Sequence, residues 1–428
     1  MSRIKIKNFG PIREGFVDND GWMDIEKVTV FIGDQGSGKS TVAKLISIFS
    51  WIEKSIICNL ISVDLLNATI FKNLCAQQDF IEFFSGDSYL SYEGDACIFE
   101  YDEQRNLFNS KINHKNFEKY VLPKIQYISA ARNLLTILNN ISAQSIIDSS
   151  GNVINLSSNI PFMVRELNPV YIKALEELAK DGYLLPISDT SVYYQNHNTF
   201  IVVKGKRVSM ASASSGIQSI TPLLLVSHFL SNEVRKDIYE KVQTIDNNLK
   251  NKIENDFSRE NTRLSENFKL ICSFGRGILT KREDVELLDK KLKKYIPSSF
   301  INIVEEPEQN LFPTSQQKVT NSLLEYNNAI KENKLVICTH SPYILASLNN
   351  SILADEVYKK TGKAINSYSE KKRVAYADVS AYMCENGRII SIKDNDSKLI
   401  NADVIDSCSA KINSDFDELL DLLPENDD

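Results

Sequence analysis

The stretch KVTVFIGDQGSGKSTVAKLISIF, residues 27–49, decides the fold of this chain. Residues 27–33 form a continuous apolar run rich in β-branched side chains, which is typical of a central strand. Residues 39–57 then carry an apolar helical face that includes Val42 and Leu45. A strand, a glycine-rich loop and a helix therefore follow one another, and this is the context that a phosphate-binding loop requires.

The loop itself, residues 33–40, matches the pattern GxxxxGK[ST]. Glycines let the backbone wrap a phosphate with its N–H groups pointing inward, and the next helix adds its positive N-terminal end. In this motif Lys39 reaches the β- and γ-phosphates and the Ser40 hydroxyl ligates magnesium. ATP and Mg²⁺ are therefore the predicted cofactors. The predicted nucleotide-binding residues are Gly33, Asp34, Gln35, Gly36, Ser37, Gly38, Lys39, Ser40 and Thr41.

A second stretch, FINIVEEPEQNLFP at residues 300–313, is an apolar strand that ends in two adjacent acids. Hydrolysis needs an acid near magnesium and a group that orients the attacking water. We predict that Glu305 is a magnesium-site residue that holds the water shell of the ion, and that Glu306 polarises the attacking water. The alternative is a pair of solvated acids at a strand end. We assign no chemistry to Glu308, which we expect in a loop that faces a second subunit.

Two further motifs complete the predicted site. VICTHSP places His340 where a strand meets a turn, downstream of the acid pair, and we predict that this catalytic histidine contacts the γ-phosphate. In MASASSGIQSITPLL, residues 210–224, Ser214, Ser215 and Gly216 precede an apolar helical run. Backbone N–H groups and hydroxyls at a helix N-terminus form an anion site, although any serine-rich helix cap looks similar.

Composition places the chain among ordinary globular proteins. It has 428 residues, of which 43% are hydrophobic and 25% charged, enough for two or three structural units. No apolar run approaches the length of a membrane span, and the N-terminus lacks a secretory signal. Seven scattered cysteines, with no CxxC pair, favour reduced thiols over disulfides or a zinc site. We therefore expect a cytoplasmic protein with no membrane partner.

The net charge of −7 is unevenly distributed. Residues 403–428 carry nine acids and one lysine, so they form an acidic tail and leave a nearly neutral body. This distribution does not resemble a strongly basic nucleic-acid footprint. Residues 231–295 are slightly basic, and KKLKK at 290–294 is either a phosphate contact or a solvated face. Nucleic-acid binding therefore stays open.

Periodicity predicts the remaining elements. In residues 231–295, apolar side chains recur every three or four positions among many charges, which predicts a long exposed amphipathic helix, with SFGRG at 273–277 as the turn into a return helix. Asp394-Asn395-Asp396 resembles the DxD of a Toprim nuclease, but a polar turn is the better interpretation. The other expected elements are strands at 2–7, 97–103 and 124–129, a polar insert at 136–165, a helix at 169–182 ended by Gly182, hairpins at 191–210 and 375–394, and a strand, turn and helix start at 333–345.

The order of the P-loop, SSGxQ, EEPE and THS motifs resembles that of ABC-type ATPase heads, the group with the SMC, Rad50 and RecF heads. The resemblance implies an α/β fold, an ABC-type P-loop head with a central mixed sheet and flanking helices, plus an inserted helical arm. It also implies a homodimer of heads or a higher homo-oligomer. ATP would be hydrolysed at a composite site between the P-loop of one subunit and the signature residues Ser214, Ser215 and Gly216 of the other.

IKNFGPI, YISAARN (127–133) and EEPEQNLFP are similar to the compact AAA ATPases of bacterial anti-phage defence, above all the ATPase subunit of PARIS-type systems and next the Septu-type ATPase. That branch commonly has glutamate where other ABC-type ATPases have aspartate, as at Glu305. The resemblance implies a sensor and scaffold that controls a separate Toprim-like nuclease effector when a phage-encoded trigger protein appears. Ala213 and Ile217 depart from the usual signature.

A DNA-repair head of the RecF/Rad50 kind, which binds DNA through its ATP-dependent dimer, is the alternative function. A transporter ATPase subunit fits less well, because the long arm after the signature is unlike those compact subunits. Arg132 is left open as a γ-phosphate contact, an inter-subunit contact or a surface salt bridge, and Gln126 is a further candidate without an assigned role. The expected units are an ATPase lobe with the P-loop (1–135), an insert and hairpin (136–210), the signature helix (211–230), the helical arm (231–297), the lobe with the acid pair and His340 (298–374), and a C-terminal hairpin, helix and acidic tail (375–428).

Overall fold

The computed structural model describes residues 2–401 except 114–116, 118–119, 139–144, 148–152, 156–160, 188 and 276–280, and beyond 401 only residues 414, 418 and 419. Most of the acidic tail and part of the predicted turn at 273–277 therefore lie outside the described residues. Among the helices it describes, none is long and apolar enough to cross a membrane. The six described cysteines are free thiols.

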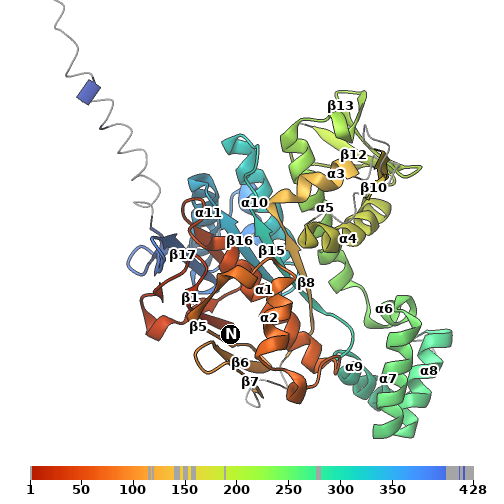
Figure 1. The fold of residues 1–428 in the computed structure, drawn as a ribbon. Helices are drawn as coiled ribbons and strands as arrows, with labels where there is room; N and C mark the ends of the chain where they lie inside the picture. Colours follow the sequence, from red (N-terminus) through yellow and green to blue (C-terminus); the bar gives the residue numbers. More distant parts are fainter. Residues whose placement is uncertain are drawn as a thin grey trace, which may run out of the picture.

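A seven-stranded mixed sheet forms the centre of the molecule (Figure 1). The five strands β17, β4, β16, β15 and β8 are parallel neighbours in that order, and β18 pairs antiparallel with β17 at one side. Every residue of β4 and β15 is buried, as expected of strands covered on both faces. The strands in sheet order are β2 (Gly15–Phe16), β18 (Arg388–Ser391), β17 (Val379–Glu385), β4 (Val28–Ile32), β16 (Lys334–Thr339), β15 (Ser299–Glu305) and β8 (Pro123–Ile128).

Helix α1 (Lys39–Ile57) lies between this sheet and a second, antiparallel one. Its ring Phe49 stacks on Tyr92 and Phe99 of the second sheet, with centroids 5.3 and 5.9 Å away, while its other apolar side chains share a core with Ile303 of the central sheet. α1 is therefore clamped on two sides. The second sheet has the order β3 (Met23–Ile25), β1 (Ser2–Phe9), β5 (Phe84–Glu93), β6 (Cys97–Asp102) and β7 (Leu107–Ile112), and α2 (Ala68–Ala76) packs beside it.

The opposite face of the central sheet is covered by helices that share a second core with β4 and β15. The sequence prediction for the first of them was partly wrong, because α4 begins at Phe162 and continues through Pro169. Buried Met163, Val164 and Leu167 anchor the earlier turns, so packing outweighs the hydrogen bond that a proline removes. The helices of this face are α4 (Phe162–Leu178), α5 (Ser215–Arg235), α10 (Pro313–Asn327) and α11 (Pro342–Thr361).

The predicted insert and hairpins contain more regular structure than the sequence suggested. The 191–210 hairpin is confirmed, with Asn196 and His197 both at positive φ in its two-residue turn, and ENG forms the matching turn between β17 and β18. Residues 136–165 are not only a polar loop. The elements of this region are α3 (Leu134–Leu138), β9 (Ser145–Ile147), β10 (Val153–Asn155), β11 (Tyr183–Leu184), β12 (Thr190–Gln195), β13 (Asn198–Val203) and β14 (Lys206–Ser209).

The helical arm projects from one end of the sheet, and the single long helix expected there was wrong (Figure 1). Four short helices pack around their own apolar core. Asp237, Asp246 and Asn261 break the expected helix because each side chain caps a new helix N-terminus by accepting a backbone N–H bond. The helices are α6 (Ile238–Thr244), α7 (Asn247–Glu260), α8 (Thr262–Phe274) and α9 (Arg282–Leu292).

The C-terminal part closes on a short pair of strands, β19 (Lys393–Asp394) and β20 (Leu399–Ile400). The Asp394 carboxylate accepts hydrogen bonds from the backbone N–H groups of Asp396 and Ser397, so the DxD-like sequence is a turn, as the sequence interpretation favoured. Taken together, these elements confirm the predicted fold class: an α/β head with a central mixed sheet, flanking helices and an inserted helical arm.

Candidate functional site

The phosphate loop connects the middle strand β4 to α1, as predicted. Two of its glycines are sterically required. Gly33, at φ +151°, would place a Cβ 2.2 Å from the Cys384 carbonyl oxygen, and Gly38, at φ +104°, would place one 2.8 Å from Ile12 Cγ1. A larger residue could therefore not take this loop path. Asp34, Gln35, Gly36 and Ser40 are exposed, whereas Lys39 and Thr41 are buried, which leaves one side of the loop open.

Lys39 folds back over the loop from the first turn of α1. Its Nζ donates to the carbonyl oxygens of Gly33 and Asp34, at 2.8 and 2.7 Å, and to Ser37 Oγ at 3.3 Å. Lys39 is only 5% exposed, and this burial lowers the pKa of its ammonium group. The surrounding acidic groups raise the same pKa, but by less. The ammonium is thus oriented by carbonyl dipoles at the open side of the loop.

Glu305 ends β15 and is 9% exposed. Its Oε1 accepts a hydrogen bond from the Tyr127 hydroxyl at 2.6 Å, and its Oε2 accepts one from the Ala130 backbone N–H at 3.1 Å. Burial, and next the Glu305 charge, raises the pKa of Tyr127 well above its usual range, so that hydroxyl stays a donor. Each carboxylate oxygen keeps one lone pair free, so the carboxylate is held in place yet can still accept from water.

Glu306 and His340 meet beside Lys39. His340, at the turn after β16, places Nε2 3.8 Å from Glu306 Oε1 and Nδ1 3.5 Å from Lys39 Nζ. Glu306 adopts φ +44°, a left-handed conformation that non-glycine residues rarely take, and its N–H donates to the Cys338 carbonyl at 2.7 Å. Three segments that are far apart in sequence thus bring an ammonium, an imidazole and a carboxylate together. Strain of this kind concentrates at functional sites.

Glu308, to which the sequence assigned no chemistry, makes a contact within its own chain. Its Oε1 accepts the backbone N–H of His340 at 2.7 Å, so it fastens the turn that carries His340 to the loop after Glu306. Its Oε2 is buried without a hydrogen-bond partner in the structure. Glu308 therefore positions the histidine, a role that only the tertiary contact between β15 and β16 could reveal.

Ser214, Ser215 and Gly216 lie at the N-terminus of α5, as predicted. Both serine side chains are exposed, and among the described residues no hydrogen bond joins them to the phosphate loop. The structure therefore assembles Lys39, Glu306 and His340 but not the signature serines. Gly216 packs against the loop after the acid pair, because a Cβ there would lie 2.7 Å from the Asn310 carbonyl oxygen.

Arg132 is fully buried, which rules out the surface salt bridge considered from sequence. Four of its five N–H donors go to backbone carbonyls: Nε to Ser219, one terminal nitrogen to Ser129 and Glu305, and the other to Glu306, at 2.9, 3.2, 2.5 and 2.6 Å. These bonds leave at most one donor for any phosphate. The γ-phosphate role is therefore disfavoured, and the residue instead ties β15 to α5.

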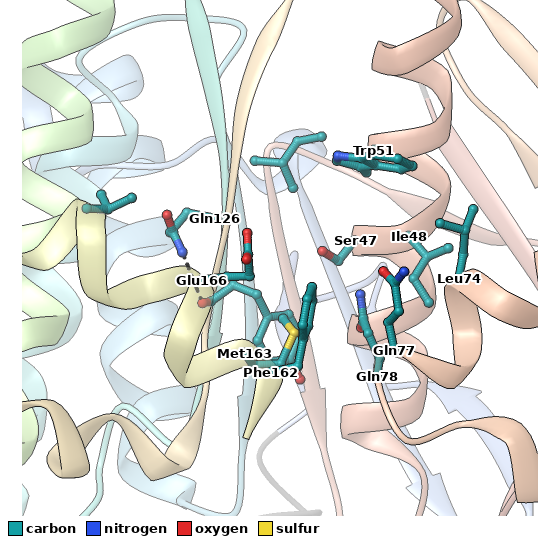
Figure 2. Close-up of a pocket in the computed structure, with 13 residues that line it drawn as sticks. Ser47, Ile48, Trp51, Leu74, Gln77, Gln78, Gln126, Phe162, Met163 and Glu166 are labelled. Atoms are coloured by element: carbon teal, nitrogen blue, oxygen red, sulfur yellow. Dashed lines mark hydrogen bonds between the residues drawn. The ribbon is translucent and has the colours of Figure 1, made fainter. Parts of the chain in front are cut away.

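Gln126 lies away from the loop. It lies two residues before the end of β8, where it pairs with Asn302 of β15, and it lines a cavity of about 370 Å³ between α1, α2 and α4. Figure 2 shows Gln126 and Glu166 on one side of this cavity and Trp51, Gln77 and Gln78 on the other. The Gln126 amide donates to the Tyr127 carbonyl at 3.3 Å. Gln126 is therefore not part of the cluster around Lys39.

The residues can hold a nucleotide and magnesium without a protein-built metal cage. Among the described residues, no group of three or more His, Cys, Asp or Glu side chains could hold a metal ion. Magnesium at phosphate loops keeps several waters and takes few protein ligands, so the exposed Ser40 hydroxyl with the oriented Glu305 carboxylate fits it. Tyr127, which sequence reasoning missed, matters because it orients Glu305, and only the register of β8 against β15 places it there.

A family match and a structural similarity relate this chain to known proteins. No curated protein matches the chain significantly. Among solved structures, the chain is similar to the crystal structure of the SmcHead bound to the C-winged helix domain of ScpA, at 10% identity and a TM-score of 0.37, over 92% of this chain and 98% of that one. The family described as AAA ATPase domain matches residues 1–345, which include the phosphate loop, the acid pair and His340. The chain therefore belongs to the AAA ATPase domain family.

Proposed function

We propose that this chain is an ABC-type ATPase that binds and hydrolyses ATP with Mg²⁺ at a composite site between two copies. The observation that carries the proposal is the meeting of Lys39, His340 and Glu306, with 3.5 and 3.8 Å between neighbouring polar atoms. A cation for phosphate, a ring nitrogen for the γ-phosphate and a carboxylate for water are the groups that phosphoryl transfer to water needs.

Each residue has one role in this proposal. Bound MgATP would supply the reactive γ-phosphoryl group and the charge that polarises it. Lys39 holds the phosphates and Ser40 the metal. Glu305, held by Tyr127, accepts from water in the magnesium shell. Glu306 orients the attacking water, because its carboxylate lies beside His340 and is 37% exposed, open to water.

The partner subunit would supply the signature. Ser214 and Ser215 are exposed at the N-terminus of α5, a helix of 21 residues whose positive end attracts an anion. Because no hydrogen bond among the described residues joins them to the phosphate loop of their own chain, we propose that they contact the nucleotide of a second copy. We propose a head-to-tail homodimer or a higher homo-oligomer.

For the biological role we propose a cytoplasmic sensor and scaffold of anti-phage defence, which controls a separate Toprim-like nuclease when a phage protein appears. The sequence resemblance to PARIS-type ATPases supports it, and the arm with its own apolar core, α6–α9, offers a surface for a second protein. A RecF/Rad50-like repair head is the second candidate, favoured by the lysines and arginines of the arm.

The division of the chain into six units, from residues 1–135 to residues 375–428, is also part of what we propose.

Glu306→Gln tests the chemistry. It keeps the shape of the side chain but removes the base, so ATP should bind with unchanged affinity while kcat falls by about 100-fold or more. ATP should then trap a dimer, seen by size-exclusion chromatography with light scattering. Glu332→Gln is the matched control, because this exposed acid lies at the opposite end of β16 from His340. Turnover by Glu306→Gln at the wild-type rate would reject the assignment.

A salt titration separates the two biological roles. Binding of a DNA duplex that weakens steeply as salt rises would favour the repair head, because each phosphate contact releases counterions. Absence of DNA binding, together with co-purification of a neighbouring gene's nuclease, would favour defence. Substituting the four lysines of KKLKK at 290–294 with glutamines, with buried Leu292 kept, should remove any DNA binding that the arm provides.

A further inference from the structure

Arg132 occupies an unusual position for a charged side chain. It is 0% exposed, and it binds the carbonyl oxygens of Glu305 and Glu306, the two residues that follow one another at the end of β15. A buried guanidinium is costly unless its donors are satisfied, and here four carbonyls satisfy four of five donors. Its side chain therefore fixes the backbone at the acid pair rather than neutralising a single carboxylate.

The same guanidinium also reaches the signature helix. Its Nε donates to the Ser219 carbonyl of α5 at 2.9 Å, one turn after Ser214 and Ser215. A second link runs in parallel, because Ser219 Oγ donates to Gln309 Oε1 at 2.8 Å in the loop that follows Glu306. In a third contact, the backbone of Gly216 packs against the carbonyl oxygen of Asn310. The first turns of α5 and the Glu305–Glu306 turn are thus joined as one packed unit.

The conformation of Glu306 depends on this unit. The residue has φ +44°, which costs about 1–3 kcal/mol for a non-glycine side chain unless its surroundings hold it. Three hydrogen bonds hold its backbone: its N–H donates to the Cys338 carbonyl, and its own carbonyl accepts from Arg132 and from the Gln309 N–H. A small shift of α5 would reach Glu306 through Arg132, and the carboxylate lies 3.8 Å from His340.

We propose that Arg132 is a positioning residue that couples the N-terminus of α5 to the Glu305–Glu306 turn of the same subunit. The inference rests on the proposed function, in which the two ends of this link serve different nucleotides. Ser214 and Ser215 contact the ATP bound by the partner subunit, whereas Glu306 acts on the ATP of its own subunit. Arg132 therefore connects the two composite sites of the dimer. Engagement of the ATP at one site then orients the Glu306 carboxylate at the other site.

Arg132→Lys is the first variant. It keeps the positive charge but replaces the planar guanidinium and its five donors by one ammonium group on a side chain of different length. Loss of coupling should lower kcat by about tenfold or more while the Kd for ATP changes less than about threefold. Arg235→Lys is the matched control: it is the same change at the C-terminal end of α5, where among the described residues Arg235 donates to the Ser231 carbonyl and the Asn232 side chain. That control should keep the wild-type kcat.

A double-mutant cycle with Ser214→Ala distinguishes coupling from a purely structural role. In the wild-type background Ser214→Ala should lower kcat by about tenfold, and in the Arg132→Lys background by less than about threefold, because the link is already cut. If Arg132→Lys fails to fold, judged by its melting temperature, Gln309→Leu replaces it in the cycle, since it removes the parallel bond from Ser219.

The outcomes separate the inference from the proposed function. Wild-type kcat in the folded Arg132→Lys protein, or losses that multiply in full in the double variant, would overturn the coupling and leave the ATPase assignment intact. No ATP turnover by the wild-type protein would overturn both. The coupling is supported if the fall in kcat of the double variant is smaller than the product of the two single falls, while ATP affinity is kept and the Arg235→Lys control stays active.

Discussion

Glu53→Gln tests a titratable carboxyl group that is buried on the phosphate-loop helix itself. Glu53 lies on α1, 4% exposed, and its Oε1 accepts the backbone N–H groups of Ala96 and Cys97 at 2.7 and 2.8 Å. Burial raises its pKa from the ordinary 4.5 to about 7, although the two N–H bonds act to lower it. The carboxyl therefore holds a proton in the folded protein over a pH range in which it has lost it in the unfolded chain.

The difference between the folded and unfolded pKa of Glu53 decides how the unfolding free energy changes with pH. A folded pKa above the unfolded one stabilises the fold below the unfolded value, and this stabilisation is lost as pH rises through about 7. With pKa values of 4.5 and about 7, Glu53 removes about 2.5 kcal/mol of unfolding free energy between pH 5 and pH 8. Glutamine does not titrate, and its Oε1 can still accept both N–H bonds. The unfolding free energy of the variant should therefore increase relative to that of the wild type as pH rises.

The assay is urea unfolding at pH 5, 6, 7 and 8, followed by the fluorescence of Trp51, which lies two residues from Glu53 on α1. Because many carboxylates titrate in this range, the informative quantity is the difference in unfolding free energy between Glu53→Gln and the wild type. The exposed Glu166→Gln controls for the loss of one negative charge. A Glu53→Gln difference that stays constant with pH, or that falls, would refute the reasoning.

Three further predictions concern the nucleotide site. Lys39→Ala removes the ammonium beside His340 and should weaken binding of a fluorescent ATP analogue by about 100-fold, and affinity near that of the wild type would contradict its role. His340→Ala should lower kcat by about tenfold in steady-state assays with the ATP Kd little changed, because the imidazole acts beside the reacting phosphate, and a larger change in Kd than in kcat would argue for a binding role. Gly33→Ala, with its Cβ 2.2 Å from the Cys384 carbonyl oxygen, should destabilise the protein by about 1–3 kcal/mol in thermal unfolding, more than Gly36→Ala, whose Cβ would meet nothing within 4 Å, and equal stabilities would count against the steric argument.

The sequence by itself determined the centre of this protein. The apolar run before the glycine loop and the amphipathic run after it predicted β4 and α1 with nearly the observed bounds, because both signals are local. The turns at Asn196 and at Asn386-Gly387 were predictable for the same reason, since two-residue hairpins select residues that accept positive φ. The acid pair and His340 were placed from strand ends, and parallel strands bring such ends to one edge of a sheet.

Only the tertiary structure decided the parts that depend on contacts between distant segments. Pro169 lies inside α4 and three capping side chains divide the arm, because packing and side-chain capping outweigh the periodic pattern there. Arg132 is a buried brace and Glu308 a support for His340, because the register of β8, β15 and β16 places their partners up to 174 residues away. Sequence specified which groups the chemistry needs, and the sheet register decided what holds each of them in place.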